Sequence, residues 1–130
     1  MAETLADIVK PSFIEVAPED TLGEVAEQMT ARNVGAVVVK DFGKLIGILT
    51  ERDLLKAMAA RVHTSEARVR QWMTEDPITV PAETPLTEAA QVMIAHGFRH
   101  LPVLNDGQVV GVVSLRRVVS ATQSQPTKPS

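Results

Sequence analysis

The chain contains one sequence pattern twice, at a constant offset of 64 residues. The segment Gly47-Ile48-Leu49-Thr50-Glu51-Arg52-Asp53 closes an apolar run, and Gly111-Val112-Val113-Ser114-Leu115-Arg116-Arg117 does the same in the second half. Identical residues at glycines and apolar positions, aligned without a gap, indicate one structural unit used twice. Differences between the copies are therefore the places to look for function. The identical pairs include Ile14/Ile78, Val16/Val80, Glu19/Glu83, Leu22/Leu86, Glu24/Glu88, Ala26/Ala90, Met29/Met93, Ala31/Ala95, Val39/Val103, Gly43/Gly107, Gly47/Gly111 and Arg52/Arg116.

Composition restricts the class of protein. A chain of 130 residues with 45% hydrophobic residues can bury a core in one domain or in two very small ones. Its net charge of −3 provides no general field for nucleic acid or anionic lipid, so we expect neither as a partner. The absence of cysteine excludes disulfides, zinc–thiolate sites and thiol catalysis. No apolar stretch reaches the roughly 18 residues of a membrane span, and Met1 to Lys10 lacks the features of a secretion signal, so we expect a cytoplasmic protein.

We place the first repeat at residues 1–62, beginning with a short N-terminal helix that Pro11 ends. Thr21 and Glu24 have the spacing of a capping box, which predicts a helix start. The apolar patterns predict a strand over 13–16, a helix over 22–33, a hairpin of buried strands over 36–39 and 45–49, and a helix from Thr50 to about Arg61.

The second repeat, at residues 63–121, is predicted to follow the same order. Ser65 and Glu66 start a short linker helix through Met73, and Thr84 caps a helix that begins at Pro85. Residues 122–130 are polar and contain two prolines, so we expect a disordered tail. The remaining elements are a strand over 78–80, the helix to His96, strands over 99–104 and 109–113, and a helix from Leu115.

Thr50 and Asp53 carry the clearest chemical signal. A helix N-terminus offers free N–H groups to phosphate, and a carboxylate there can accept bonds from two ribose hydroxyls. The same Thr-x-x-Asp spacing also forms a capping box, which stabilises a helix by about 1 kcal/mol without any ligand. The spacing alone leaves both roles open, and they are compatible.

The repeated order of elements resembles the tandem cystathionine-β-synthase (CBS) domain pair, or Bateman module. The resemblance covers about residues 5–121 and rests on Gly47 to Asp53 and on Gly97-Phe98-Arg99-His100-Leu101-Pro102-Val103. It implies an α+β fold of two tandem β-α-β-β-α repeats, packed with pseudo-two-fold symmetry. It also implies a regulatory module that binds adenosine-bearing ligands in two clefts between the repeats and commonly forms dimers.

The resemblance assigns roles within one cleft. Thr50 and Asp53 would hold the sugar, and Arg99 with His100, at the start of a strand in the other repeat, would hold the phosphates. Ile48, Ile78 and Thr79 would flank the base. In the opposite cleft, Gly35 and Ala36 replace the cationic pair, and Arg117 replaces the aspartate. Arg117 has no acceptor for ribose hydroxyls, so it either fills that site itself or holds a bare phosphate. One competent nucleotide site per chain is expected.

Other candidates have weaker support. His63, His96 and His100 share no helical face, so we expect no metal site. Glu15, Glu19 and Glu24 fit solvated or capping positions better than an acid–base pair. Trp72, the single tryptophan, either covers the packing face of the linker helix or stacks on a base.

The sequence therefore predicts a stand-alone regulatory protein that binds an adenine nucleotide (AMP, ADP or ATP) and has no catalytic activity and no obligatory cofactor. Two alternatives stay open: a protein-interaction adaptor with empty clefts, and a binder of another adenosyl ligand such as S-adenosylmethionine or NAD(H). We also expect a homodimer and an unidentified regulated protein as partners, because the helices from Thr50 and Leu115 carry more apolar residues than one small core needs.

Overall fold

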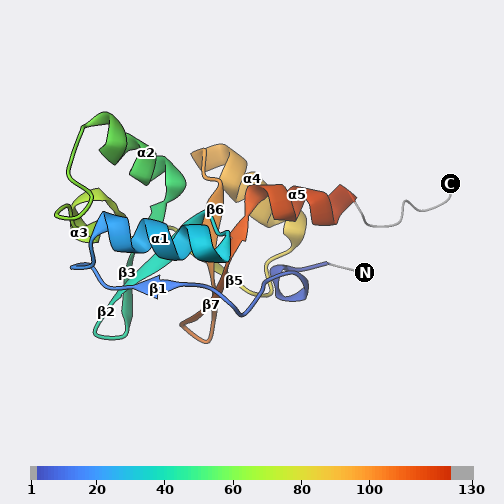
Figure 1. Cartoon of the computed structure of the whole chain (residues 1–130). Helices are drawn as coiled ribbons and strands as arrows, with labels where there is room; N and C mark the ends of the chain where they lie inside the picture. The colour runs from blue at the N-terminus through green and yellow to red at the C-terminus, as the bar shows by residue number, and fades with distance from the viewer. Residues whose placement is uncertain (1–2, 124–130) are drawn as a thin grey trace, which may run out of the picture. The chain divides into compact units, whose positions relative to one another are not determined.

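The computed structural model describes residues 3–123 and divides the chain into two compact units. The first unit is Phe13–Pro77, and the second combines Met1–Ser12 with Ile78–Ser130. Each unit contains one sheet and its own helices (Figure 1). The mixed α+β fold expected from the repeat is confirmed.

The first unit is built on a four-stranded sheet with the order β1-β2-β3-β4. β1 pairs with β2 in parallel, while β2 with β3 and β3 with β4 are antiparallel. Strand β2 contains three consecutive valines and is buried from Ala36 to Val39, as predicted for a strand covered on both faces. The elements are β1 (Glu15–Val16), α1 (Leu22–Arg32), β2 (Ala36–Asp41), β3 (Lys44–Thr50), α2 (Glu51–Ala59), α3 (Val69–Trp72) and β4 (Thr74–Glu75).

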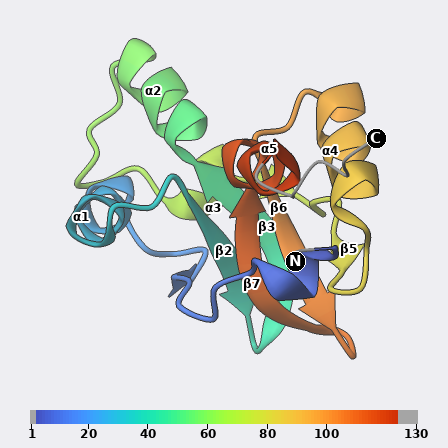
Figure 2. The same ribbon diagram turned by 90° about the vertical axis from the view of Figure 1, so that its right-hand side faces the viewer.

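The second unit repeats this plan on a three-stranded sheet with the order β5-β6-β7. A 3-10 turn at Leu5–Asp7 replaces the predicted N-terminal helix. Figure 2 shows α4 and α5 side by side at the sheet of this unit, and both contribute buried residues to its core. The elements are β5 (Val80–Pro81), α4 (Leu86–His96), β6 (His100–Asn105), β7 (Gln108–Ser114) and α5 (Leu115–Gln123).

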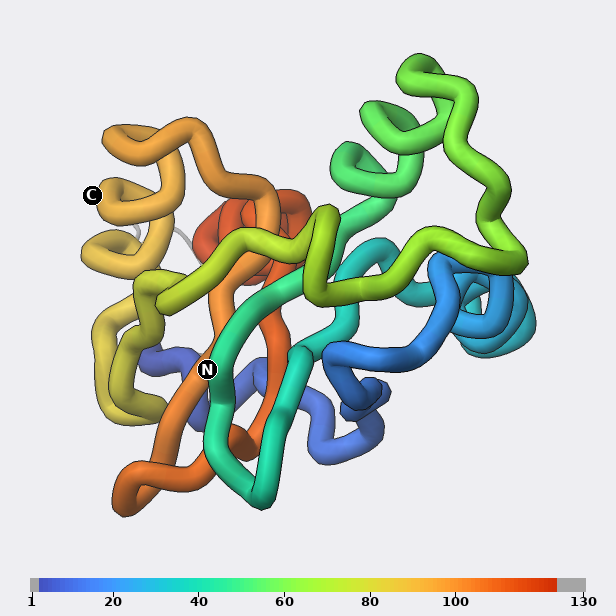
Figure 3. Tube along the Cα trace, turned by 90° about the vertical axis from the view of Figure 1, so that its left-hand side faces the viewer, coloured from blue at the N-terminus to red at the C-terminus, as the bar shows by residue number. Residues whose placement is uncertain are grey.

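The segment that precedes each repeat in the sequence packs on the other repeat's core. Val69, fully buried, lies in the core of the first unit, and Leu5, fully buried, lies in that of the second. The hydrogen bonds correspond at the same offset: Val69 N donates to Asp20 O at 2.9 Å, and Leu5 N to Thr84 O at 3.0 Å. Figure 3 traces the chain after α2 as it returns beside β3.

Two predicted helix starts are corrected by these segments. The linker helix begins at Val69 rather than Ser65, because the carbonyls of Thr64 and Ala67 accept bonds from the first turn of α1. Thr84 does not cap α4: the N-cap is Pro85, which makes no side-chain cap. Instead Leu86 N donates to Glu3 O at 3.1 Å, so a backbone carbonyl satisfies the helix start.

The capping box at α1 is confirmed. Thr21 Oγ1 accepts from Glu24 N at 3.2 Å, and Glu24 Oε1 accepts from Thr21 N at 3.1 Å. Of the predicted tail, Thr122 and Gln123 belong to α5, and residues 124–130 lie outside the described residues. Among the helices of residues 3–123, none is both long and apolar enough to cross a lipid bilayer.

Candidate functional site

Thr50 and Asp53 meet at the N-terminus of α2. Asp53 Oδ2 accepts from Thr50 N at 2.9 Å and from Thr50 Oγ1 at 3.1 Å, and Thr50 Oγ1 lies 3.4 Å from Asp53 N. The capping role open at the sequence level is therefore present in the structure. Both bonds to the carboxylate end on Oδ2, so Oδ1 can accept a further bond without loss of the cap.

The equivalent position at the start of α5 is built differently. Ser114 Oγ still accepts from Arg117 N, at 3.1 Å, so the hydroxyl half of the cap is kept. The Arg117 side chain turns to the N-terminal segment, where its Nε donates to Ile8 O at 2.9 Å. Arg117 thus fixes the segment that carries Leu5 into this core.

Arg99 and Gly35 occupy equivalent places before β6 and β2. Each carbonyl accepts a bond from the first residue of the following helix, Leu115 N on Arg99 O at 2.8 Å and Glu51 N on Gly35 O at 3.0 Å. The backbone geometry is therefore the same in both units, and only the first unit lacks a cationic side chain there. The Arg99 side chain is exposed, and His100 is half-buried as the first residue of β6.

The three residues expected to flank a base differ in burial. Ile48 is buried, and it lies on the face of β3 opposite to its neighbour Leu49, which packs in the core of the first unit. Ile78 is 37% exposed, and Thr79 beside it is half-buried. Neither belongs to the core of the second unit, so both are available for contact.

A CBS-domain family model matches the chain twice, at residues 5–60 and 69–124. The chain belongs to the CBS-domain family. The two matches start at Leu5 and Val69, so each CBS repeat of the sequence begins with its leading segment. In the structure, each leading segment packs with the rest of the other repeat.

Curated relatives include proteins of different lengths. The chain is 36% identical over 123 residues to an uncharacterised 17.7 kDa protein of Acidianus ambivalens, covering 93% of this chain and 74% of that protein. It is 36% identical over 131 residues to CBSX3, a mitochondrial CBS domain-containing protein of Arabidopsis thaliana, covering 91% of this chain and 64% of that one. The chain thus spans slightly less than two thirds of CBSX3.

Solved structures of CBS pairs match over nearly the whole chain. The CBS domain of NE2398 superposes with a TM-score of 0.86 at 29% identity, covering 92% of this chain and 94% of that one. The CBS pair of MJ0100, solved with 5′-methylthioadenosine and S-adenosylmethionine, gives 0.85 at 25% identity, with coverages of 95% and 98%. CBSX2, solved with AMP, gives 0.75 at 26% identity, with coverages of 94% and 97%.

The predicted site residues of this CBS pair fall into two sets. Ile48, Thr50 and Asp53 belong to the first unit, while the second set, Ile78, Thr79, Arg99 and His100, belongs to the second unit. Ile48 lies within β3, and Thr50 and Asp53 lie at the start of α2. In the second unit, Ile78 and Thr79 precede β5, and Arg99 and His100 lie at the start of β6. The sequence reasoning missed the bond from Arg117 to Ile8.

No group of three or more His, Asp or Glu side chains within residues 3–123 is arranged to hold a metal ion. His96 instead stacks on Phe98, with ring centroids 5.2 Å apart.

Proposed function

We propose that this CBS pair is a non-catalytic sensor that binds one adenine nucleotide (AMP, ADP or ATP) per chain and regulates a partner protein. The observation that carries the proposal is the shared chemistry of the ligands in two structural neighbours. AMP in one and 5′-methylthioadenosine and S-adenosylmethionine in the other all contain adenosine. Arg99 and His100, to which we assign the phosphates, would favour a nucleotide over the other two.

We assign the sugar to Thr50 and Asp53. A ribose diol donates two hydroxyls, and a carboxylate is the side chain that accepts both. Because the cap uses Oδ2, the sugar would bind Oδ1 and leave the helix start intact.

We assign the phosphates to Arg99 and His100 and the base to the side chains of Ile48, Ile78 and Thr79. A guanidinium pairs with phosphoryl oxygens through charge-assisted hydrogen bonds, and the number of phosphates then affects affinity. Because the two sets belong to different repeats, a ligand that binds both favours one arrangement of the repeats. A shift of population toward that arrangement is the signal.

We propose that the second repeat offers no equivalent sugar site. Arg117 has only donors, and its Nε bonds to Ile8 O. A ligand would have to displace this bond and would still lack an acceptor for its hydroxyls.

Calorimetric titration with AMP, ADP, ATP, NADH and S-adenosylmethionine tests the proposal. We expect Asp53→Ala to weaken adenosine and nucleotide binding by more than about tenfold, because a hydrogen bond to a charged group is lost. We expect Arg99→Ala to weaken ATP by about tenfold and adenosine hardly at all. Equal losses for ATP and adenosine would refute the phosphate assignment.

Glu24→Ala is the matched control for Asp53→Ala. It removes the acidic member of the same type of capping box, at α1, a helix that contains none of the assigned site residues. Both variants should lose a similar, small part of the unfolding free energy, and only Asp53→Ala should lose ligand. If the chain binds none of the five ligands, the interaction adaptor with empty clefts is the better account.

A further inference from the structure

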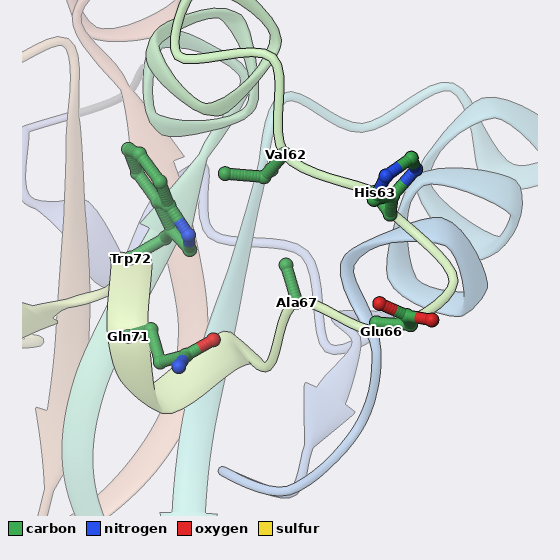
Figure 4. A pocket seen from close by; sticks show the side chains of 6 residues that line it. All are labelled: Val62, His63, Glu66, Ala67, Gln71 and Trp72. Carbon is green, nitrogen blue, oxygen red and sulfur yellow. The ribbon is translucent and has the colours of Figure 1, made fainter.

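The first unit contains an open hollow of about 380 Å³ between the end of α2 and α3. None of the residues assigned to the nucleotide lines it, and its volume falls within the range of small-molecule sites. The lining residues are Val62, His63, Glu66, Ala67, Gln71 and Trp72 (Figure 4).

The hollow has an apolar side and a polar side. Figure 4 shows the Trp72 indole standing at one side with the Val62 side chain pointing toward it. His63 and Glu66 lie at the other side, with the methyl group of Ala67 between the two. A ligand that fits would have a compact apolar body and one polar or charged group.

Backbone hydrogen bonds hold the lining in place. Thr64 O accepts from Gly23 N at 2.9 Å, and Ala67 O accepts from Leu22 N at 2.9 Å, so α1 fixes the loop that carries Glu66. Glu66 N donates to His63 O at 2.9 Å. A site that is formed before the ligand arrives loses less entropy on binding.

The charge of the lining selects the ligand. Glu66 is the one acidic residue among the six, and none of them is Lys or Arg, although Arg61 and Arg68 flank the segment in the sequence. The indole face is the aromatic surface that binds cations best. We propose that this hollow binds a small organic cation, with its ammonium group between Trp72 and Glu66.

Choline is a suitable probe because 3,3-dimethylbutan-1-ol has nearly the same shape and no charge. Trp72 is the single tryptophan of the chain, so its fluorescence reports directly on this hollow. We expect a saturable change with choline and binding of the neutral alcohol that is about tenfold weaker. Absence of a saturable change, or equal binding of both probes, would overturn the proposal.

Two variants locate the site. Glu66 is exposed, so Glu66→Gln should fold normally and weaken choline by about tenfold. In calorimetry, Trp72→Phe should weaken choline less than Glu66→Gln does, because phenylalanine keeps an aromatic face. Unchanged choline affinity in Glu66→Gln would contradict the assignment.

Asp53→Ala separates this proposal from the nucleotide site. It should lose nucleotide and bind choline as the unmodified chain does, since Asp53 does not line the hollow. If the chain binds no nucleotide but binds choline in a Glu66-dependent way, only the nucleotide proposal fails. If choline binding is lost in Asp53→Ala, the two sites are not independent and the proposed hollow is wrong.

Discussion

Gly47 in β3 and Gly111 in β7 occupy equivalent positions, and at both the structure leaves no room for a Cβ atom. A Cβ on Gly47 would lie 2.6 Å from Met73 Sδ and 3.0 Å from Thr74 O. A Cβ on Gly111 would clash with Val9 Cγ2 and lie 2.8 Å from Lys10 O. Since Met73 and Val9 are themselves related by the repeat, both glycines leave space for the segment that crosses from the other repeat.

We predict that Gly111→Ala lowers the free energy of unfolding by about 1–3 kcal/mol, as overpacking does. Val9→Ala in the Gly111→Ala background should recover only part of the loss, because the carbonyl of Lys10 is backbone and stays in place. Urea denaturation of both single variants and the double variant measures this. Simple additivity of the two substitutions would show that Val9 is not the obstacle.

Phe42 has a backbone conformation that does not suit a bulky residue. It is fully exposed at the tip of the β2–β3 hairpin and has a φ of 50°, in the left-handed region. Its counterpart is Asp106, with a φ of 51° before Gly107, and Asp-Gly is a preferred pair for such turns. A bulky side chain is strained at this φ, and here it buries nothing in return.

We therefore predict that Phe42→Asp raises the free energy of unfolding by about 0.5–1 kcal/mol, the scale of turn substitutions that suit their φ. Phe42→Ala, which keeps the strain but removes the ring, should change stability less. The midpoint of urea denaturation distinguishes the two. A loss of stability in Phe42→Asp would mean that the ring contributes to the fold.

The start of α1 shows how a helix cap responds to pH. The hydroxyl of Thr21, and then its backbone N–H, donate to the Glu24 carboxylate and lower the pKa of Glu24 below its ordinary value of 4.5. A group whose pKa is lower in the folded state contributes stability above its unfolded pKa, and this is lost as pH falls through the folded value.

We predict that replacing Glu24 by Gln removes part of the acid sensitivity of the chain. Glutamine can still accept the bonds from Thr21, but it does not titrate. Urea denaturation between pH 7 and pH 3 should show the stabilities of the two proteins converging toward the acid end. Parallel curves over this range would mean that Glu24 does not contribute to the pH dependence.

The crossing segments define the elements of each unit. Leu5 and Val69 are both fully buried, each in the core of the unit that does not contain the rest of its own repeat. We predict that Leu5→Ala speeds hydrogen exchange in β6 and β7, while Val69→Ala does so in β2 and β3. Each should cost about 1–4 kcal/mol, because a cavity forms in a core. Faster exchange in the strands of the other unit, whose core does not contain the substituted residue, would contradict the observed packing.

The sequence predicted most elements but not this crossing. Hydrophobic periodicity and the Thr21–Glu24 box placed α1 and every strand except β4 within a few residues. The repeat itself could not indicate which core receives Leu5, because Leu5 and Val69 are equivalent in it. The same sequence pattern results whether each of them packs in its own repeat or in the other one. Thr84 was misjudged for the same reason: the carbonyl that satisfies α4 belongs to Glu3, which is distant in the sequence.

At the scale of the whole molecule, the candidate site residues could be proposed from the sequence mainly where the two repeats differ at equivalent positions. Comparison of the two copies singled out Asp53 against Arg117 and Arg99 against Gly35. The bond from Arg117 to Ile8 depends on a contact between residues 109 positions apart, which no local pattern specifies.

We propose that the chain forms a homodimer through the exposed surface of α2. Leu55 and Met58, one turn apart, are 64% and 69% exposed, while Ala57 on the other side of the helix is buried in the core. Two large apolar side chains side by side indicate an interface more strongly than scattered ones. A second copy of α2 offers the same apolar pair, as a two-fold interface requires.

We predict that Leu55→Lys and Met58→Lys convert a dimer into a monomer without lowering the stability of the isolated fold. Both side chains are largely exposed, so lysine costs little in the monomer, whereas in an interface it would bury a charge. Sedimentation equilibrium over a range of concentrations measures the change. Ile94→Lys is the control, because Ile94 on α4 is 66% exposed and should not alter association. A monomeric unmodified chain, or a dimer that survives both α2 substitutions, would place any interface elsewhere.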